Sequence, residues 1–529
     1  MFKHLLFPLC LIILSFTLLG EDDLPQETPR PASEGYRHVL STPYIAKPEG
    51  ITGDYRKITV SPKTFPYPLL RHRLNVFSTE NETGNAYPLY VTALKEFNFH
   101  LQRTQEQCFR SEEYRKLDPQ NEGDKQKMDY LRFKAFPLYN HWYSGMHTEI
   151  TAEEEAKIYA QLEGVYKLLE KASRKTYFDW SDVHENKGVL TSLEPLHESR
   201  ILLRYLADKA DWEIRNGKYD DAIKTIRTGL ALGDFVMEST PAGFMVGVLI
   251  GSALKGAMYE RLICLSAQPD APNLYPALMQ ISFSTKPLIT ATQSEMLWLV
   301  SPNIGRDVLD SLDTCSPEQA KTLFNGVVTS FVAALGLGIS DAGQSCQQAA
   351  FLLLSYIPAK KRLLAKGLSE QEIEALSAYQ IVTPFFLEKI IAAYDMLAVC
   401  ASMPIGETYT AINLDEYYAR ATRMSVDSNS SADMVVAMFL PAVHSVREGY
   451  YRQELMVDLL KIISAIRYYA AVHEGRLPES LAAITEVAVP KTSPITGKPY
   501  DYRVEGNTVI IDYDSNRYGG QSRMEIVVK

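Results

Sequence analysis

The sequence has few cysteines, and none of them form a close pair. Six cysteines occur among 529 residues, and no Cys-x-x-Cys motif is present. This spacing excludes a disulfide-dense scaffold and argues against a structural zinc site. If Cys10 leaves with a cleaved N-terminal segment, five widely separated cysteines remain. Cys315 and Cys346 are the nearest pair in sequence, and one or two bridges can form in an oxidising compartment.

An excess of basic residues is also lacking. The chain has 54 Lys and Arg against 64 Asp and Glu, which gives a formal net charge of −10. A nucleic-acid partner requires a basic face that neutralises phosphates. We therefore expect no nucleic-acid partner. The one dense basic run, Lys360-Lys361-Arg362, is short, and we interpret it as a solvated helix end.

The motifs of several enzyme classes are absent. HExxH, GxSxG, GxGxxG and GxxxxGKS/T do not occur. Their absence argues against a zinc protease, an α/β-hydrolase elbow, a dinucleotide-binding fold and a P-loop. The ten histidines are scattered and include no His-x-His pair. We expect no cofactor, apart from the calcium ion considered below.

The N-terminus has the layout of a secretory signal peptide. Lys3 and His4 precede an apolar run over 5–19, and Gly20 is followed by three acidic residues. This order is typical of exported proteins. The run is short for a membrane span, which needs about 20 apolar residues; an anchor at residues 1–20 is the alternative. We expect a protein of the periplasm or cell envelope, with membrane contact only through residues 4–20 if these are retained.

The rest of the chain divides into three parts. Residues 21–84 are rich in proline and predict a linker and an irregular segment, with one strand at Tyr55–Val60. Residues 85–481 show helical periodicity, and residues 482–529 show strand and turn signals. We predict a mainly α, multi-helical body, solenoid-like in one interpretation, with a small antiparallel β element at the C-terminus.

Within the body, one helical hairpin has a clear turn signal. Residues 210–233 predict two helices that break at Asn216-Gly217, with Gly217 as the C-cap. The spacing is tetratricopeptide-like, although no second copy occurs at the ~34-residue period of such repeats. Residues 246–265 and 327–353 are apolar, and their interrupting polar residues favour core helices over membrane spans.

Four segments carry a resemblance to a known family. They are ENETGNAYPLYVTAL (80–94), ADWEIRNGKYDDAIKTIRTGLALG (210–233), IRYYAAVHEGRLPESL (466–481) and SPITGKPYDYRVEGN (493–507). The chain resembles uncharacterised exported helical proteins of planctomycete-type bacteria, and the resemblance implies no known enzyme activity. The last two segments are also similar to the C-terminal half of type II secretion pseudopilins, although the N-terminus lacks their prepilin signal.

Two histidines are the candidate catalytic residues. His141 and His147 flank Trp142-Tyr143 in a polar, aromatic loop, where one imidazole could act as an acid or base. Surface or packing histidines are the alternative interpretation, because the sequence identifies no group that would orient either ring.

The last loop contains the one pattern that suggests a metal. Asp512, Asp514 and Asn516 are spaced at i, i+2 and i+4, which places oxygen ligands on one side of a loop for calcium. The similarity to pseudopilins, whose acidic tails bind calcium, implies the same ion. Against this, Arg517 stands where an EF-hand loop needs glycine, and a polar turn before the final strand is the alternative.

These observations favour a non-enzymatic exported scaffold or binding protein of the cell envelope, with protein partners. One alternative is an envelope hydrolase that uses His and carboxylate acid–base chemistry in a cleft between helices. Another is an accessory of a secretion or pilus-like machine, which would require the C-terminal tail to be exposed and docked to another chain.

Overall fold

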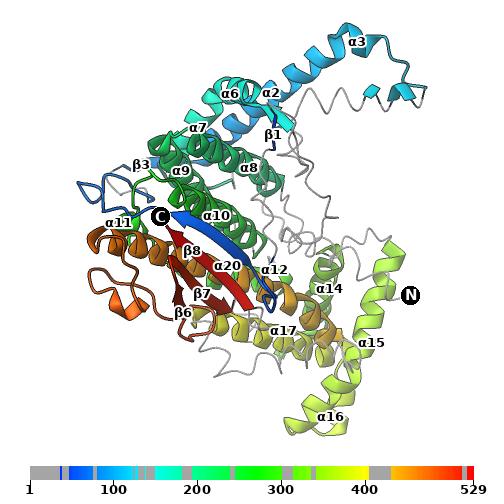
Figure 1. Cartoon of the computed structure of the whole chain (residues 1–529). Coiled ribbons are helices and arrows are strands. Elements are labelled where there is room, and N and C mark those ends of the chain that lie inside the picture. The colour runs from blue at the N-terminus through cyan, green and yellow to red at the C-terminus, as the bar shows by residue number, and fades with distance from the viewer. Residues whose placement is uncertain are drawn as a thin grey trace.

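The protein is mainly helical, with a small sheet packed on one side of the helical body (Figure 1). The computed structural model describes residues 36–38, 47–75, 80–121, 123–125, 127–128, 138, 149–180, 194–238, 245–300, 314–334, 341–403, 431–514 and 521–529. The expected mainly α fold with a small C-terminal β element is confirmed.

In the first group of helices, α6 begins with a capping box. At the start of α6, the Thr151 hydroxyl accepts a hydrogen bond from the amide of Glu154 at 3.2 Å, and the Glu154 carboxylate accepts one from the amide of Thr151 at 3.0 Å. This capping box satisfies amides that have no partner within the helix. The elements of this group are β1 (Tyr36–His38), β3 (Glu82–Asn85), α2 (Tyr87–Arg110), α3 (Glu112–Arg115), β4 (Glu149–Thr151), α6 (Ala152–Gln161), α7 (Glu163–Ser173) and β5 (Lys175–Tyr177), with β1 paired to β4 and β3 to β5.

Helices α8 (Glu194–Arg215) and α9 (Tyr219–Met237) form the predicted hairpin. The chain reverses at Gly217, whose φ of +71° is a left-handed conformation that favours glycine. The amide of Gly217 donates to the carbonyl of Ile214 at 3.0 Å, and the amide of Lys218 donates to the carbonyl of Glu213 at 2.8 Å. This pair of bonds is a Schellman motif, so the predicted helix break and C-cap are confirmed.

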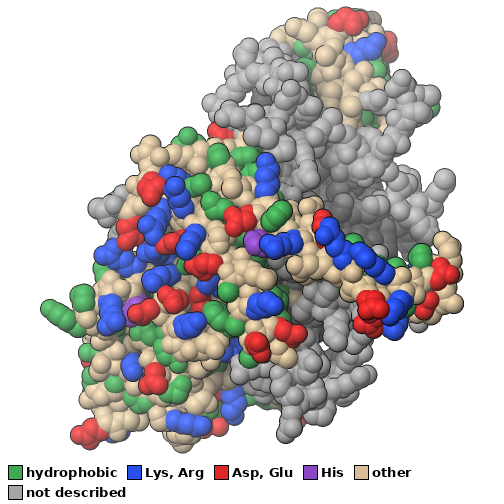
Figure 2. Space-filling model, turned by 90° about the horizontal axis from the view of Figure 1, so that it is seen from above, with side chains coloured by type: hydrophobic (Ala, Val, Ile, Leu, Met, Phe, Trp, Pro, Cys, Tyr) green, Lys and Arg blue, Asp and Glu red, His purple; other side chains and the backbone are tan. Residues whose placement is uncertain are grey.

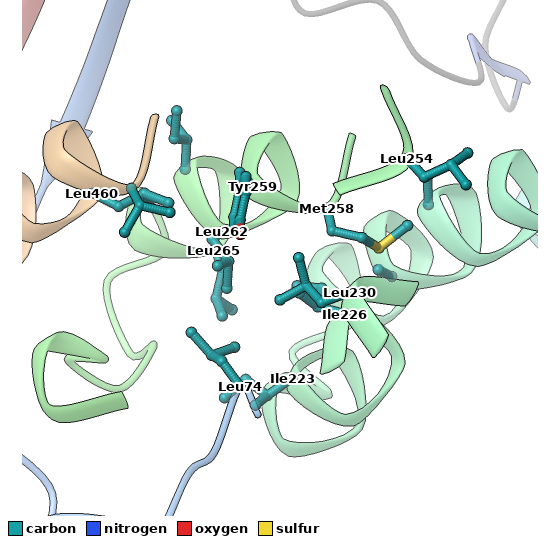
Figure 3. Packing of buried hydrophobic residues seen from close by; sticks show 14 of the residues in the cluster. Leu74, Ile223, Ile226, Leu230, Leu254, Met258, Tyr259, Leu262, Leu265 and Leu460 are labelled. Atoms are coloured by element: carbon teal, nitrogen blue, oxygen red, sulfur yellow. The ribbon is translucent and has the colours of Figure 1, made fainter. Parts of the chain in front are cut away.

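The centre of the body is α10 (Met245–Ser266), which packs against α9 and α20 (Ser431–Val472). Figure 3 shows Ile226 and Leu230 of α9 beside Met258 of α10, and Leu460 of α20 near the other end of α10. All four side chains are buried. The apolar stretch 246–265 is therefore a core helix, as predicted. Among the described residues, no helix combines the length and apolar character needed to cross a membrane.

Glycines allow α9 and α10 to approach closely. A β-carbon on Gly251 would lie 2.6 Å from the carbonyl oxygen of Gly233 and 3.0 Å from the amide nitrogen of Met237. Both atoms belong to the backbone of α9, so they could move only if the helices separated. At Gly256, in the same helix, a β-carbon would meet no atom within 4 Å. The close approach therefore depends on Gly251 and not on Gly256.

A second hydrophobic cluster lies beyond α10. Phe324 of α14 and Phe386 of α17 are fully buried and meet edge to face, with ring centroids 5.3 Å apart. The apolar stretch 327–353 is divided between α14 and α15, and α15 packs mainly on α17 at the periphery of the body (Figure 1). The elements of this group are α12 (Lys286–Val300), α14 (Pro317–Ala334), α15 (Asp341–Ala365), α16 (Glu370–Glu374) and α17 (Ala378–Ser402). The short helix α11 (Tyr275–Leu278), which precedes them, is buried in the first cluster.

The 42-residue helix α20 passes through both clusters. Val446 and Tyr450 belong to the second cluster, whereas Leu455 and Ile463 belong to the first. Because one helix contributes to both cores, the two groups of helices share a common element.

Near its C-terminal end, α20 buries an arginine. The guanidinium of Arg467 is fully buried and donates to the carbonyls of Ser61 at 3.1 Å, Ala271 at 3.0 Å and Pro272 at 3.5 Å. The Asn273 side chain donates to the carbonyl of Lys63 at 2.9 Å. Burial lowers the pKa of Arg467 to about 10. These bonds hold α20, the chain after β2 and the chain before α11 together.

The sheet has the strand order β2-β8-β7-β6. Its strands are β2 (Tyr55–Val60), β6 (Asp501–Glu505), β7 (Thr508–Asp514) and β8 (Gln521–Val528), and the 3₁₀ turn η5 (Leu481–Ala483) precedes the last three. Strands β6, β7 and β8 are antiparallel, as predicted, but β2 pairs with β8 in parallel. The predicted strand at Tyr55–Val60 is thus confirmed, and it pairs with the last described strand of the chain.

The glycine contacts yield a test of the fold. We expect Gly251→Ala to destabilise the protein by about 1–3 kcal/mol, because the new methyl group overpacks the α9–α10 contact. The control Gly256→Ala should leave stability unchanged or raise it by up to about 1 kcal/mol, since alanine favours helix over glycine. Urea unfolding of both variants measures the difference. Equal stabilities of the two variants would contradict the packing described.

Candidate functional site

The structure describes only some of the predicted site residues. His141, His147 and Asn516 lie outside the described residues. Asp512 and Asp514 lie at the end of β7. The predictions on the two histidines therefore remain predictions, and the geometry bears on two of the three calcium candidates.

The carboxylate of Asp512 is held by two arginines. It accepts hydrogen bonds from Arg523 at 2.6 and 3.0 Å and from Arg503 at 2.7 Å. Burial acts to raise the pKa of Asp512, but the bonds from the two guanidinium groups prevail and the pKa is lowered. Asp514 lies 3.8 Å from the amino group of Lys498. A calcium ion at Asp512 would have to displace both guanidinium groups. Within the described residues, no three His, Cys, Asp or Glu side chains converge as a metal site.

Charged side chains are also buried along α8, where Asp211 and Glu213 each have a basic partner. Asp211 forms an ion pair with Arg261 at 3.0 Å, and Glu213 pairs with Lys209 and accepts a bond from Thr225 at 2.7 Å. Burial raises the pKa of both acids, and the partners oppose this rise. The pairing inside the body indicates that these residues connect the helices to one another.

A different arrangement occurs on α20, where two acids share one lysine. Glu454, Asp458 and Lys461 follow one another at i, i+4 and i+7, so they lie on one face of the helix. The amino group of Lys461 lies 3.6 Å from Asp458, and the two side chains are 16% and 15% exposed. We call Glu454 and Asp458 the acid pair. One lysine cannot balance two partly buried carboxylates, so the negative charge is incompletely compensated.

The electrostatic consequence is a raised pKa for both members of the acid pair. Burial raises the pKa of Asp458 from 3.8 to about 6; Lys461 opposes this rise, and Glu454 adds to it. Burial also raises the pKa of Glu454. A carboxyl group that titrates near pH 6 exchanges its proton close to neutral pH, which is the property required of a general acid or base.

The phenol of Tyr500 lies beside the acid pair. Tyr500 is only 6% exposed, and within the described residues its hydroxyl has no hydrogen-bond partner. Burial raises the pKa of Tyr500, and the charges of Asp458, Tyr513 and Glu454 raise it further. The arrangement thus places a buried donor of the C-terminal tail, Tyr500, where it is affected by the charges of two carboxylates of α20.

A second candidate site is a surface on α15. Its outer face carries apolar side chains in water: Leu353 is 74% exposed, Ile357 65% and Leu364 39%. The opposite face, with Ser355, Ala359 and Leu363, is buried against the body. We call the outer row the α15 seam, and its members are Cys346, Ala350, Leu353, Ile357, Lys360 and Leu364.

The face of the molecule seen in Figure 2 presents a contrast to this seam. There, Lys and Arg side chains are interspersed with Asp and Glu side chains over the described residues. Mixed charges of this kind are the ordinary condition of a soluble surface. Three large aliphatic side chains exposed in one row on a single helix are unusual on such a surface. The α15 seam is therefore a candidate interaction surface.

The sequence contained signals for both sites. In GYYRQELMVDLLK (449–461), two acids and a lysine at helical spacing interrupt a helix that is otherwise largely apolar. In CQQAAFLLLSYIPAKKRLL (346–364), apolar residues occur on every side of the helix, which exceeds what a peripheral helix can bury. Neither pattern by itself predicts a site, because the burial of one and the exposure of the other depend on neighbouring elements.

Comparison of the chain with known protein families, with curated proteins and with solved structures found no match in any of the three. We therefore infer function from the geometry of the acid pair and of the α15 seam.

The acid pair leads to a prediction about pH. The pKa of Asp458 is raised from 3.8 to about 6 in the fold, so protonation of this carboxyl group stabilises the fold. The stabilisation is complete below pH 3.8 and is lost as the pH rises through 6. The rise corresponds to roughly 3 kcal/mol. We expect the free energy of unfolding of Asp458→Asn, relative to that of the wild type, to rise by about 1–3 kcal/mol between pH 4 and pH 7.5.

Urea unfolding at pH 4, 5, 6 and 7.5 measures this change. Asp501→Asn is the matched control, because Asp501 is exposed on β6, and it should change stability by less than about 0.5 kcal/mol at every pH. A difference between Asp458→Asn and the wild type that does not vary with pH would refute the coupling.

Proposed function

We propose that the protein is an exported, non-enzymatic scaffold or binding protein of the cell envelope, and that it binds protein partners through the α15 seam. The observation that carries the proposal is the exposure of Leu353, Ile357 and Leu364 in one row. Exposed apolar rows on soluble proteins mark interaction sites, because burial of each such side chain against a partner is favourable by about 1.5–3 kcal/mol.

The sequence supports the localisation within this proposal. Residues 1–20 have the layout of an export signal. Their removal would give a periplasmic protein, and their retention would anchor the protein at the membrane through residues 4–20. The net charge of −10 supports protein partners over nucleic acid.

We also propose that the helical body is solenoid-like and that the α8–α9 hairpin is a tetratricopeptide-like unit of it. Its support is the spacing around Gly217 and the short turn between two packed helices. We propose calcium only as a ligand of the loop that follows Asp512 and Asp514, and the bonds from Arg503 and Arg523 to Asp512 weaken that proposal.

The binding proposal is tested by photo-crosslinking in the native cell. A photo-reactive amino acid at position 353 should give a discrete adduct of higher mass, and the same residue at position 99 should not. Phe99, on α2, is the control because it is also exposed, at 59%. Adding Ile357→Glu should reduce the adduct at least tenfold, since a charge in an apolar contact weakens binding by more than about 1.4 kcal/mol. Equal labelling from positions 353 and 99 would count against the proposal.

The second candidate function is an envelope hydrolase centred on the acid pair. The observation that favours it is the combination of Asp458, whose pKa is about 6, with the buried hydroxyl of Tyr500. Two carboxyl groups in different environments can divide the roles of acid and base. In this alternative, Glu454 and Asp458 replace the histidines as the acid–base residues.

The hydrolase alternative is tested with glycan, peptide and ester substrates of envelope type. We expect Glu454→Gln and Asp458→Asn each to lower kcat about 10²–10⁴-fold, and Asp458→Asn to remove a limb of the pH profile near pH 6. Asp501→Asn should retain full activity. If none of the substrates is cleaved, or if Glu454→Gln keeps the wild-type rate, the alternative fails.

The accessory of a secretion or pilus-like machine remains the third proposal, and it has the least support. It required an exposed tail, whereas Val509, Ile511, Met524 and Ile526 of the tail belong to the same buried cluster as the helices.

A further inference from the structure

The spacing along the α15 seam is that of a coiled coil. Cys346, Ala350, Leu353, Ile357, Lys360 and Leu364 are separated by four, three, four, three and four residues. A 3-4 alternation keeps side chains on one narrow stripe, which pairs with the same stripe of another helix. The seam therefore has the form of a surface for a helical partner.

The face of α15 toward the body confirms that this stripe points outward. Ser355 and Ala359 are fully buried, and Leu363 is 6% exposed. These residues pack on the neighbouring helices, and α15 lies at the periphery of the body (Figure 1). A second helix could thus approach the seam without displacing the buried side of α15.

The seam is complementary to itself when it is reversed. If two copies of α15 cross antiparallel about a two-fold axis at the level of Ser355, Leu353 meets the partner's Ile357. In the same pairing, Lys360 meets the partner's Ala350, and Leu364 meets the partner's Cys346. Each long side chain then faces a small one, except at the centre, where two branched aliphatic residues meet. Such matching of large to small is what close packing requires.

Charge selects this direction over the parallel one. In a parallel pair, Lys360 would face the partner's Lys360, and like charges at a seam position are destabilising. In the antiparallel pair, the stem of Lys360 can lie over the partner's Ala350 while its ammonium group reaches water. Within the described residues, Lys360 and Lys361 form no ion pair, so no acidic side chain holds either of them away from the seam.

We propose that α15 pairs with α15 of a second copy of this chain, antiparallel across a two-fold axis at Ser355. The inference rests on the proposed function, because it names the occupant of the same binding surface. An isologous contact of this kind closes at two copies. One pair of helices buries less than the roughly 1,200–2,000 Å² of a typical stable interface, so the dimer is expected to dissociate reversibly on dilution.

The test is a disulfide placed by the symmetry. In the full chain carrying Leu364→Cys, the new thiol should lie opposite the partner's Cys346. Copper(II)-phenanthroline would remove two electrons from each thiol pair, both protons would pass to solvent, and a dimer joined by two 346–364 bonds would result. Mass spectrometry of the cross-linked peptides identifies the bond. The same variant with Cys346→Ser should give no such dimer.

The wild-type chain supplies the control for direction. In an antiparallel pair, the two Cys346 residues are separated by about 27 Å along the helix axis, at 1.5 Å per residue, so they cannot be joined. A 346–346 bond in the wild type would overturn the antiparallel arrangement. Sedimentation velocity should show a wild-type dimer, and Leu353→Glu should raise its dissociation constant at least tenfold. Leu353 is 74% exposed, so this variant should fold normally, and Phe99→Glu should leave the dimer intact.

The remaining outcomes separate the two proposals. A monomer at about 100 µM, well above the range of typical specific affinities, together with an adduct to a different protein from position 353, would overturn self-pairing and leave the binding function in place. A monomer with no specific adduct from position 353 would overturn both.

Discussion

The structure depends on one buried cation whose hydrogen bonds go to backbone carbonyls and not to a carboxylate. The guanidinium of Arg467 is removed from water, and its hydrogen bonds go to backbone carbonyls of Ser61, Ala271 and Pro272. A buried charge is tolerated only where such acceptors surround it. Two stretches of chain far apart in sequence must therefore lie at this one turn of α20, and the sheet and the helical body are fixed to each other there.

The same helix combines structural and chemical roles. α20 contributes Val446 to one core and Ile463 to the other, and between them it carries the acid pair. The ionised forms of these acids are less stable in the fold than in water, as the raised pKa of Asp458 shows. Side chains that lower stability at neutral pH are expected where a protein uses them, or where nothing else fills the site.

Local patterns in the sequence predicted much of the fold, but the sites required tertiary structure. The strand at Tyr55–Val60, the capping box at Thr151 and the turn at Gly217 follow from a few adjacent residues. The partner of that strand, β8, lies more than 400 residues away, and no local pattern specifies it. The face shared by Glu454 and Asp458 follows from helical spacing, whereas their burial beside Tyr500 does not. Likewise, α15 is apolar on several sides, and only its packing on α17 determines which side meets water.

The parallel pairing of β2 with β8 has a consequence for how the protein reaches its fold. A chain that is synthesised from its N-terminus presents residues 55–60 long before residues 521–528 exist. During that interval β2 has no strand to pair with on the β8 side. The amides of Asp54 and Gly53 cannot yet donate their hydrogen bonds to the hydroxyl of Ser522 and the carbonyl of Gln521. Closure of the sheet is thus a late, non-local event that follows assembly of the helices. Completion of the fold therefore has to wait until residues 521–528 have been synthesised.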